Sequence, residues 1–281
     1  MGSFDVKIAD VGPHFPPGVT HIIGHGSSCF VGLIDPQTVL KYPYFPDDRS
    51  RIEVEHKLLQ HAGRHRRIIE SAGLTESGLL LWHAVNGTLH DYILLQQHHG
   101  EQLSVAQRLR YCVQIAEGIV HLHSRSVYHG DLRPGNILLD EALDVKIADV
   151  QGVLKSGRTG EVVLDGLARE NYMYFMPRNG DYLDTKTDLF AFGSTMHFIM
   201  TGGQEVFDDL LVPPTTDDRQ QQQQPQDHQE EQDRREKEAY RRFVEKEFPD
   251  TSHLCTAIVQ RCWRGEYETA DQVLDELRTL G

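Results

Sequence analysis

The chain has 281 residues with 42 acidic and 28 basic side chains, which gives a formal net charge of −14. This excess of negative charge argues against nonspecific nucleic-acid binding, because that function needs basic patches to meet phosphates. No run of about 18 apolar residues occurs, so we expect no membrane span. The N-terminus lacks a basic stretch followed by an apolar one, so we also expect no signal peptide.

The cysteine content fits a reducing compartment. None of the four cysteines has metal-ligand spacing relative to another, and a disulfide framework is improbable at so low a density. We therefore expect an intracellular protein located in the cytoplasm, with the nucleus as the open alternative.

The first third of the chain reads as strands with one helix. Apolar and β-branched runs bounded by turn residues predict strands over 19–23, 30–34, 38–42, 68–69 and 78–82. A helix is predicted from Arg51 to His61, and its inner face would carry Ile52, Leu58 and Leu59.

The remainder reads mostly as helices. Ser104 can cap a helix that runs to His123, and further helices are predicted over 187–200, 254–263 and 269–280. A strand-rich front and a helix-rich back predict one domain of two lobes, about 17–84 and about 85–281, with a ligand cleft at the junction.

The segment 213–238 is unusual in composition. It contains two adjacent prolines, five consecutive glutamines and mixed charge. Between residues 204 and 250, 14 acidic residues stand against 7 basic ones, so half of the net charge lies in this part of the chain. The pattern predicts a disordered, low-complexity insert between helices. We expect a tolerated surface insertion, with contact to a protein partner as the alternative.

The most informative stretch runs from His129 to Asn136. It places the Asp131 carboxylate and the Asn136 amide five residues apart, and an apolar triplet follows directly. A second such triplet at 145–147 precedes Asp149. Phosphoryl transfer from Mg-ATP needs an Asp that orients the acceptor hydroxyl, a metal-binding Asn and a second metal-binding Asp. The stretch resembles the catalytic loop and metal hairpin of eukaryotic-type protein kinases.

The resemblance extends upstream. The residues from Gly24 to Val31 resemble the kinase glycine-rich loop, although Cys29 stands where a third glycine is usual. Lys41 resembles the lysine that holds the α- and β-phosphates. Its glutamate partner should lie on the following helix, where Glu55 matches best and Glu53 is the competing choice.

The resemblance implies an α+β, bilobal protein-kinase fold and assigns roles at its cleft. ATP would bind through Gly24, Gly26, Val31, Lys41 and the hinge residue Ala84, and Asn136 and Asp149 would bind Mg²⁺. Asp131 would orient the acceptor hydroxyl, Arg133 would neutralise γ-phosphate charge, and Glu55 would hold Lys41. Residues 5–11 repeat 144–150, but only Asp149 lies downstream of the catalytic loop, so Asp10 receives no role. The end of the chain resembles small fungal kinase-like sequences.

Several positions depart from the family pattern. Gly130 replaces the arginine that usually pairs with an activation-loop phosphate, so activation through that phosphate is not expected. Gln151 replaces a flexible glycine after the metal-binding Asp149. Arg178 stands where a glutamate usually pairs with a distant arginine, and we expect it to pair with an acid in the insert. Asn171 lies near a position where a threonine often supports the catalytic loop.

These observations favour an ATP-dependent protein kinase that phosphorylates Ser/Thr hydroxyls of protein substrates. The altered segment from Asp149 to Arg178 keeps open a pseudokinase, a nucleotide-binding scaffold with little or no transfer activity. A small-molecule kinase of similar fold is a third reading. The start of the helix at Asp188 and the Cys262-Trp263 pair favour the protein-kinase branch over it.

Overall fold

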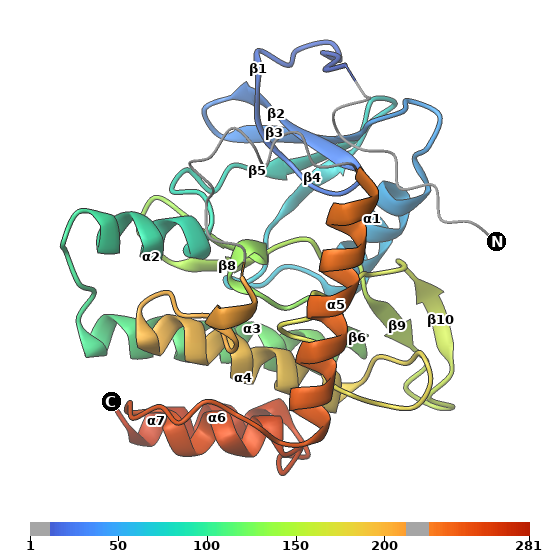
Figure 1. The fold of residues 1–281 in the computed structure, drawn as a ribbon. Coiled ribbons are helices and arrows are strands. Elements are labelled where there is room, and N and C mark those ends of the chain that lie inside the picture. Colours follow the sequence, from blue (N-terminus) through green and yellow to red (C-terminus); the bar gives the residue numbers. More distant parts are fainter. Residues whose placement is uncertain (1–11, 212–224) are drawn as a thin grey trace.

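The computed structural model describes residues 12–211 and 225–281. A small antiparallel sheet with one helix forms the upper lobe in Figure 1, and a larger, mainly helical lobe lies below it. The first copy of the repeat, at residues 5–11, and the glutamine run lie outside the described residues. This architecture confirms the predicted α+β, bilobal fold.

The small lobe contains one sheet and one helix. Its strands pair in the order β1-β2-β3-β5-β4, and all the pairs are antiparallel. The helix α1, Ser50–Ala62, follows β3 in the chain. The strands are β1 His21–His25, β2 Cys29–Asp35, β3 Thr38–Pro43, β4 Ser71–Leu74 and β5 Leu79–Trp82.

The alternation of side chains along β3 decides which of them reach the cleft. Successive side chains of a strand point to opposite faces of the sheet. Leu40 and Tyr42 pack with Phe30 in a small outer cluster, whereas Val39 belongs to the main core. Lys41 is on the same face as Val39, so its ammonium group is directed toward the interior of the molecule.

The large lobe is built around packed helices. The helix α3, Val105–Ser124, contacts both α4, Thr185–Thr201, and α7, Ala270–Thr279, and α4 also contacts α6, Thr256–Trp263. α4 is buried along most of its length, as its apolar sequence predicts. A shorter helix, α2, covers Leu89–His98. None of the helices that the structure describes is both long and apolar enough to cross a membrane.

Helix starts follow the capping chemistry of the sequence. The Ser104 hydroxyl accepts a hydrogen bond from the Gln107 backbone at 3.2 Å, which confirms the predicted cap of α3. The Asp184 carboxylate accepts bonds from the backbone of the first turn of α4.

Short strands and 3₁₀ turns connect the helices, and several of the predicted site residues lie in or between them. They are β6 Val127–Tyr128, β7 Ile137–Leu139, β8 Val145–Ile147, β9 Val153–Lys155, β10 Val162–Asp165 and the 3₁₀ turns η2 Pro134–Asn136 and η3 Asp208–Leu210. β7 and β8 form a two-stranded hairpin, and β10, β9 and β6 form a separate sheet.

The predicted strand at 68–69 is wrong. Ile68 makes only an isolated bridge to Ile147 of β8, and the strand begins at Ser71. Both Ile68 and Ile69 are buried, and the Ile69 N–H donates to the Ile147 carbonyl at 2.8 Å, so their apolar character reflects packing beside β8 rather than membership of the upper sheet.

The prediction of a disordered insert over 213–238 is also wrong for its second half. Residues from Pro225 onward belong to a helix, α5, that continues to Val244. Its opposite charges lie three or four residues apart, as in the pairs that Arg235 and Arg242 make with Glu231 and Glu238. Such pairs stabilise a helix even where few apolar residues are present. The composition of this segment suggested disorder because composition does not record the spacing of opposite charges.

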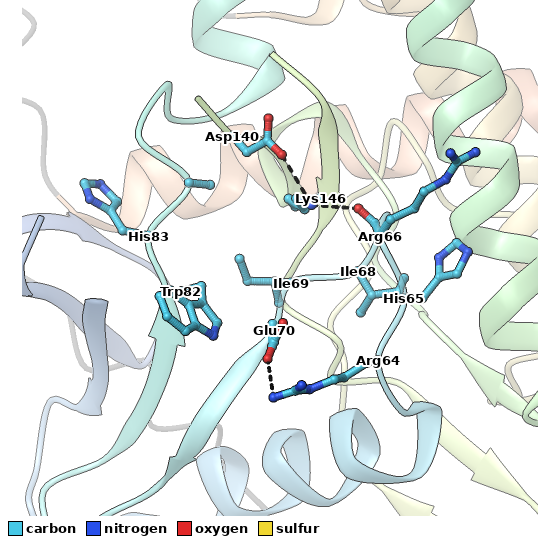
Figure 2. Close-up of a pocket in the computed structure, with 11 residues that line it drawn as sticks. Arg64, His65, Arg66, Ile68, Ile69, Glu70, Trp82, His83, Asp140 and Lys146 are labelled. Atoms are coloured by element: carbon cyan, nitrogen blue, oxygen red, sulfur yellow. Dashed lines mark hydrogen bonds and ion pairs between the residues drawn. The ribbon is translucent and has the colours of Figure 1, made fainter. Parts of the chain in front are cut away.

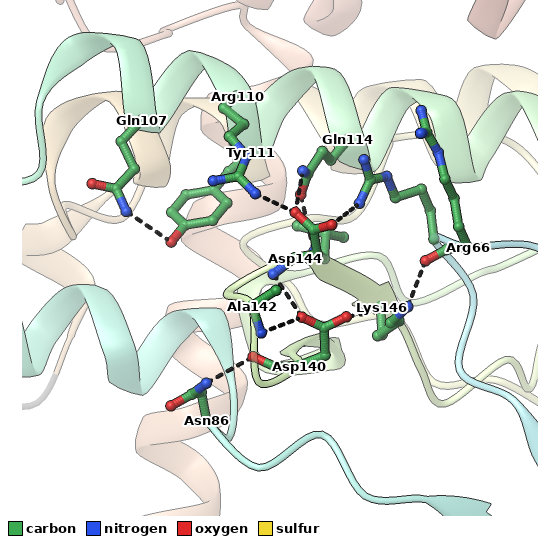
Figure 3. Close-up of polar contacts among 12 residues, drawn as sticks. Arg66, Asn86, Gln107, Arg110, Tyr111, Gln114, Asp140, Ala142, Asp144 and Lys146 are labelled. Atoms are coloured by element: carbon green, nitrogen blue, oxygen red, sulfur yellow. Dashed lines mark hydrogen bonds and ion pairs between the residues drawn. The ribbon is translucent and has the colours of Figure 1, made fainter.

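A polar network fixes the hairpin of β7 and β8 to the large lobe (Figure 3). The Asp144 carboxylate accepts hydrogen bonds from Gln114 at 2.7 Å and from Arg110, both on α3, and it pairs with Arg67 at 3.1 Å. Partial burial would raise the pKa of Asp144, but these donors lower it to about 2. These contacts therefore fix the hairpin that precedes Asp149 to α3.

Candidate active site

Lys41 joins two parts of the molecule at the junction of the lobes. Its ammonium group donates to Glu55 Oε2 of α1 at 2.6 Å and also contacts Asp149 Oδ1, which follows β8. Burial opposes a charge on Lys41, yet the two carboxylates keep its pKa above the ordinary value for lysine. Lys41 in turn lowers the pKa of Asp149 against the effect of burial. One cation therefore holds two anionic side chains that are distant in sequence.

The geometry decides between the two glutamates on α1. Glu55 lies on the helix face that carries Ile52, Leu58 and Leu59, and it is fully buried. Glu53 is partly exposed and pairs with Arg49 at 3.5 Å instead. Two residues correspond to about 200° of rotation around a helix, so the two carboxylates cannot face the same side.

The Asp131 carboxylate is held by three donors. Arg133 Nε donates to Oδ2 at 3.2 Å, Asn136 Nδ2 donates to the same oxygen at 2.8 Å, and the Asn171 backbone donates to Oδ1 at 3.3 Å. The Asp131 backbone N–H donates to His129 Nδ1 at 3.2 Å. These contacts fix the orientation of Asp131 before any substrate binds.

The backbone of the same loop is fixed by Asp188 in the first turn of α4. Its carboxylate accepts hydrogen bonds from the backbone N–H groups of His129, at 2.8 Å, and Gly130, at 3.0 Å. Gly130 has a φ of +74°, and a Cβ there would lie 2.4 Å from Leu183 Cδ1. The loop conformation thus favours glycine where the family usually has arginine.

The glycine-rich loop spans the turn from β1 to β2. Gly24 pairs with Val31 across the hairpin, and the Gly26 N–H donates to the Cys29 carbonyl at 2.8 Å. A Cβ at Gly26 would meet no atom within 4 Å, so packing among the described residues does not require glycine there. A ligand that approaches the backbone closely would require it. Val31 packs against the main core, which also contains Ala84.

The donor set of the cleft fits a hard divalent cation such as Mg²⁺. Asn136 Nδ2 donates to the Asp131 carbonyl and carboxylate, so the Asn136 amide oxygen is directed away from Asp131. Asp149 adds a partly exposed carboxylate. Carboxylate and amide oxygens are the ligands that Mg²⁺ prefers. The assignment of these two residues to the metal remains a prediction.

The expected partner of Arg178 was wrong. Arg178 pairs with Glu170, eight residues earlier in the same segment, through both carboxylate oxygens. Its side chain is 2% exposed and also lies over the rings of Phe175 and Tyr182. Burial raises the pKa of Glu170 to about 7, although Arg178 opposes the shift. Arg178 is therefore tied to its own segment rather than to the insert.

Sequence reasoning missed Gln151, which contacts two of the predicted site residues, and Glu205, which contacts the segment after Asp149. Gln151 donates to both Glu55 and Asp149, although its position suggested only a lost glycine. Glu205 accepts a hydrogen bond from the buried Tyr174 hydroxyl at 2.8 Å. Neither residue lies in a motif. The sequence pointed to Gln151 only because it stands where the family usually has glycine.

A hollow of about 360 Å³ lies at the segment that joins the lobes (Figure 2). Its cations are already paired, Arg64 with Glu70 at 2.7 Å and Lys146 with Asp140 at 3.3 Å. Of the residues predicted to bind ATP, Ala84 alone borders it. We therefore place the candidate site at the residues around Lys41 and not in this hollow.

Relatives of the chain include kinases of Arabidopsis thaliana, Oryza sativa subsp. japonica and Girardia tigrina. It is 28% identical over 205 residues to the calmodulin-binding receptor-like cytoplasmic kinase 3 of Arabidopsis thaliana, covering 66% of this chain and 39% of the relative. It is 27% identical over 203 residues to the LRR receptor-like serine/threonine-protein kinase ER2 of Oryza sativa subsp. japonica, covering 66% and 20%. The tyrosine-protein kinase SPK-1 of Girardia tigrina is 29% identical over 172 residues, covering 58% and 34%.

The chain spans about two fifths or less of the length of these relatives. Their sources do not support the expected likeness to fungal sequences. The family model described as protein tyrosine and serine/threonine kinase matches residues 39–269, which include Lys41, the catalytic loop and α6. The chain belongs to this protein kinase family.

Proposed function

We propose that the chain is an ATP-dependent protein kinase that transfers the γ-phosphate of Mg-ATP to Ser/Thr hydroxyls of protein substrates. The observation that carries this proposal is the contact of the Lys41 ammonium group with both Glu55 and Asp149. This contact supports the proposal because phosphoryl transfer in the family requires a lysine–glutamate pair on the helix and a metal-binding aspartate close to it.

Each residue of the cleft has a role in the proposed reaction. Lys41 and the backbone of the glycine-rich loop would hold the phosphates of ATP, and Asn136 and Asp149 would hold Mg²⁺. The bound ion would neutralise charge on the transferred phosphate. Asp131, fixed by its donors, would orient the acceptor hydroxyl and accept its proton. Arg133 is partly exposed beside Asp131 and would stabilise negative charge on the γ-phosphate.

The choice of Ser/Thr over Tyr as the acceptor residue is a separate part of the proposal. One relative is named as a serine/threonine-protein kinase and another as a tyrosine-protein kinase. The Ser/Thr assignment follows the resemblance of the catalytic loop to that of Ser/Thr kinases, in which lysine often stands where this chain has Arg133.

The test is transfer from radiolabelled ATP to a mixed protein substrate, followed by identification of the labelled amino acids. We expect label on Ser and Thr, and we expect Asp131→Asn to lower the transfer rate by about 10²–10⁴-fold. Mg-ATP binding, measured by thermal shift, should be retained in the variant because Asp131 is not a predicted nucleotide ligand. Nucleotide binding without transfer that depends on Asp131 would instead identify a nucleotide-binding scaffold, and label on Tyr would overturn the Ser/Thr assignment alone.

A further inference from the structure

Gln151 connects α1 to the metal hairpin in parallel with Lys41. Its side-chain amide donates to Glu55 Oε2 at 3.1 Å and to Asp149 Oδ1 at 2.9 Å. These are the two oxygen atoms that the Lys41 ammonium group also contacts. Glu55 and Asp149 are thus bridged twice, once by a cation and once by a neutral amide that uses its two N–H donors.

The backbone on either side of Gln151 is closely packed. A Cβ at Gly152 would lie 2.0 Å from the Tyr128 carbonyl oxygen, and a Cβ at Gly166 would lie 2.2 Å from the Gln151 carbonyl oxygen. The preceding residue, Val150, is fully buried. The side chain of Gln151 therefore extends from a fixed point, which is what a residue needs in order to orient its neighbours.

The two bridges differ in what happens to them when nucleotide binds. On the proposed function, the Lys41 ammonium group is drawn toward the phosphates of ATP. The two carboxylates would then repel each other more strongly, because the cation between them is shared with the ligand. The amide of Gln151 has no charge to give to a phosphate, so its two charge-assisted hydrogen bonds persist. Glycine, usual at this position in the family, has no side chain that could form them.

We propose that Gln151 is a positioning residue that couples α1 to Asp149, so that Glu55 and Asp149 are held in place before nucleotide binds and while it is bound. The part that concerns bound nucleotide rests on the proposed function. The part that concerns the nucleotide-free protein does not.

The experiment compares Gln151→Met, which keeps the length of the side chain but removes both donors, with the wild-type chain. Hydrogen–deuterium exchange without nucleotide should be about tenfold faster in α1 and unchanged in α3, since hydrogen bonds to charged groups contribute a factor of this order. Equilibrium binding of a fluorescent ATP analogue should be about tenfold weaker with Mg²⁺. The substitution should weaken binding of the analogue less in EDTA, because Asp149 is proposed to contact the nucleotide only through Mg²⁺.

The control is Gln229→Leu, which removes an amide–carboxylate hydrogen bond of 2.9 Å to Asp233 on α5, remote from the cleft in sequence and exposed. It should leave both measurements unchanged. Gln151→Glu has the same shape as the wild-type side chain but places a third carboxylate beside two others. We expect exchange in α1 at least as fast as in Gln151→Met.

Exchange of α1 at the wild-type rate in either Gln151 variant overturns the proposal, whatever the nucleotide affinity. If the wild-type chain binds no Mg-nucleotide, the proposed function is wrong. Hydrogen–deuterium exchange of α1 in the nucleotide-free protein still decides the role of Gln151 in that case.

Discussion

The proposed nucleotide centre and the segment that follows it are held together in different ways. The nucleotide centre, defined here as Lys41, Glu55, Asp131, Asn136 and Asp149, keeps the family residues and links elements that are distant in sequence. Lys41 and Asp149 are 108 residues apart, whereas Arg178 and Glu170 are separated by only 8. The activation segment, residues 149–178, has lost family residues and is closed by a local ion pair.

This difference between the two regions reflects what each of them requires in the folded protein. Assembly of the nucleotide centre depends on the relative position of the lobes, so its contacts have to be long-range. The activation segment also makes long-range contacts, since Gln151 reaches Glu55 and the Asn171 backbone reaches Asp131, but its buried pair of Arg178 and Glu170 is local and forms without a phosphate. Gly130, in place of the arginine that would bind such a phosphate, is consistent with this arrangement.

Removal of Lys41 should have the largest effect. Lys41→Met leaves Glu55 and Asp149 without their shared cation, and loss of one member of a buried ion pair costs about 3–5 kcal/mol of unfolding free energy. Transfer activity should be abolished as well. Chemical denaturation measures the first effect, and Lys57→Met, an exposed change on α1, is the matched control with an expected change of about 0.5 kcal/mol or less.

Removal of Arg178 tests the other region. Arg178→Met should destabilise the protein by about 3 kcal/mol, because it leaves the buried Glu170 carboxyl without its partner. The exposed Arg158, in the same segment, provides the control as Arg158→Met. Equal midpoints of denaturation for the two variants would show that the local pair does not stabilise the segment.

The pH dependence of stability should reveal Glu170. Its pKa is raised to about 7 in the folded protein, above its unfolded value, so the folded state binds the proton more tightly. The stability that this group contributes is present at low pH and is lost as pH rises through 7. Glu170→Gln cannot titrate, so its unfolding free energy relative to wild type should rise by about 2 kcal/mol between pH 5 and pH 8. A difference that is constant with pH would contradict the assignment.

Much of the fold was predictable because its signals are local. Alternation in β3, the helical face of α1 and the cap at Ser104 each depend on a few neighbouring residues, and the structure shows all three. The helix α5 was missed because glutamine and charge content suggested disorder, whereas the spacing of opposite charges favours a helix.

The cleft was predictable only where the family pattern is intact. The motif order brought Lys41 to Glu55, and burial on one face of α1 explains why Glu53 does not compete. Gln151 and Arg178 stand where the family has other residues, and each has a new partner. A contact such as that of Gln151 with Glu55, 96 residues away, depends on the folded arrangement of the lobes. No local pattern in the sequence encodes it.

The most direct test of the account is γ-phosphate transfer by the wild-type chain after complete phosphatase treatment, measured against the untreated protein and against Asp131→Asn. The account predicts that treated and untreated protein transfer phosphate at the same rate and that the variant is slower by at least about 10²-fold. Transfer that disappears on phosphatase treatment and returns on phosphorylation of the activation segment would contradict it.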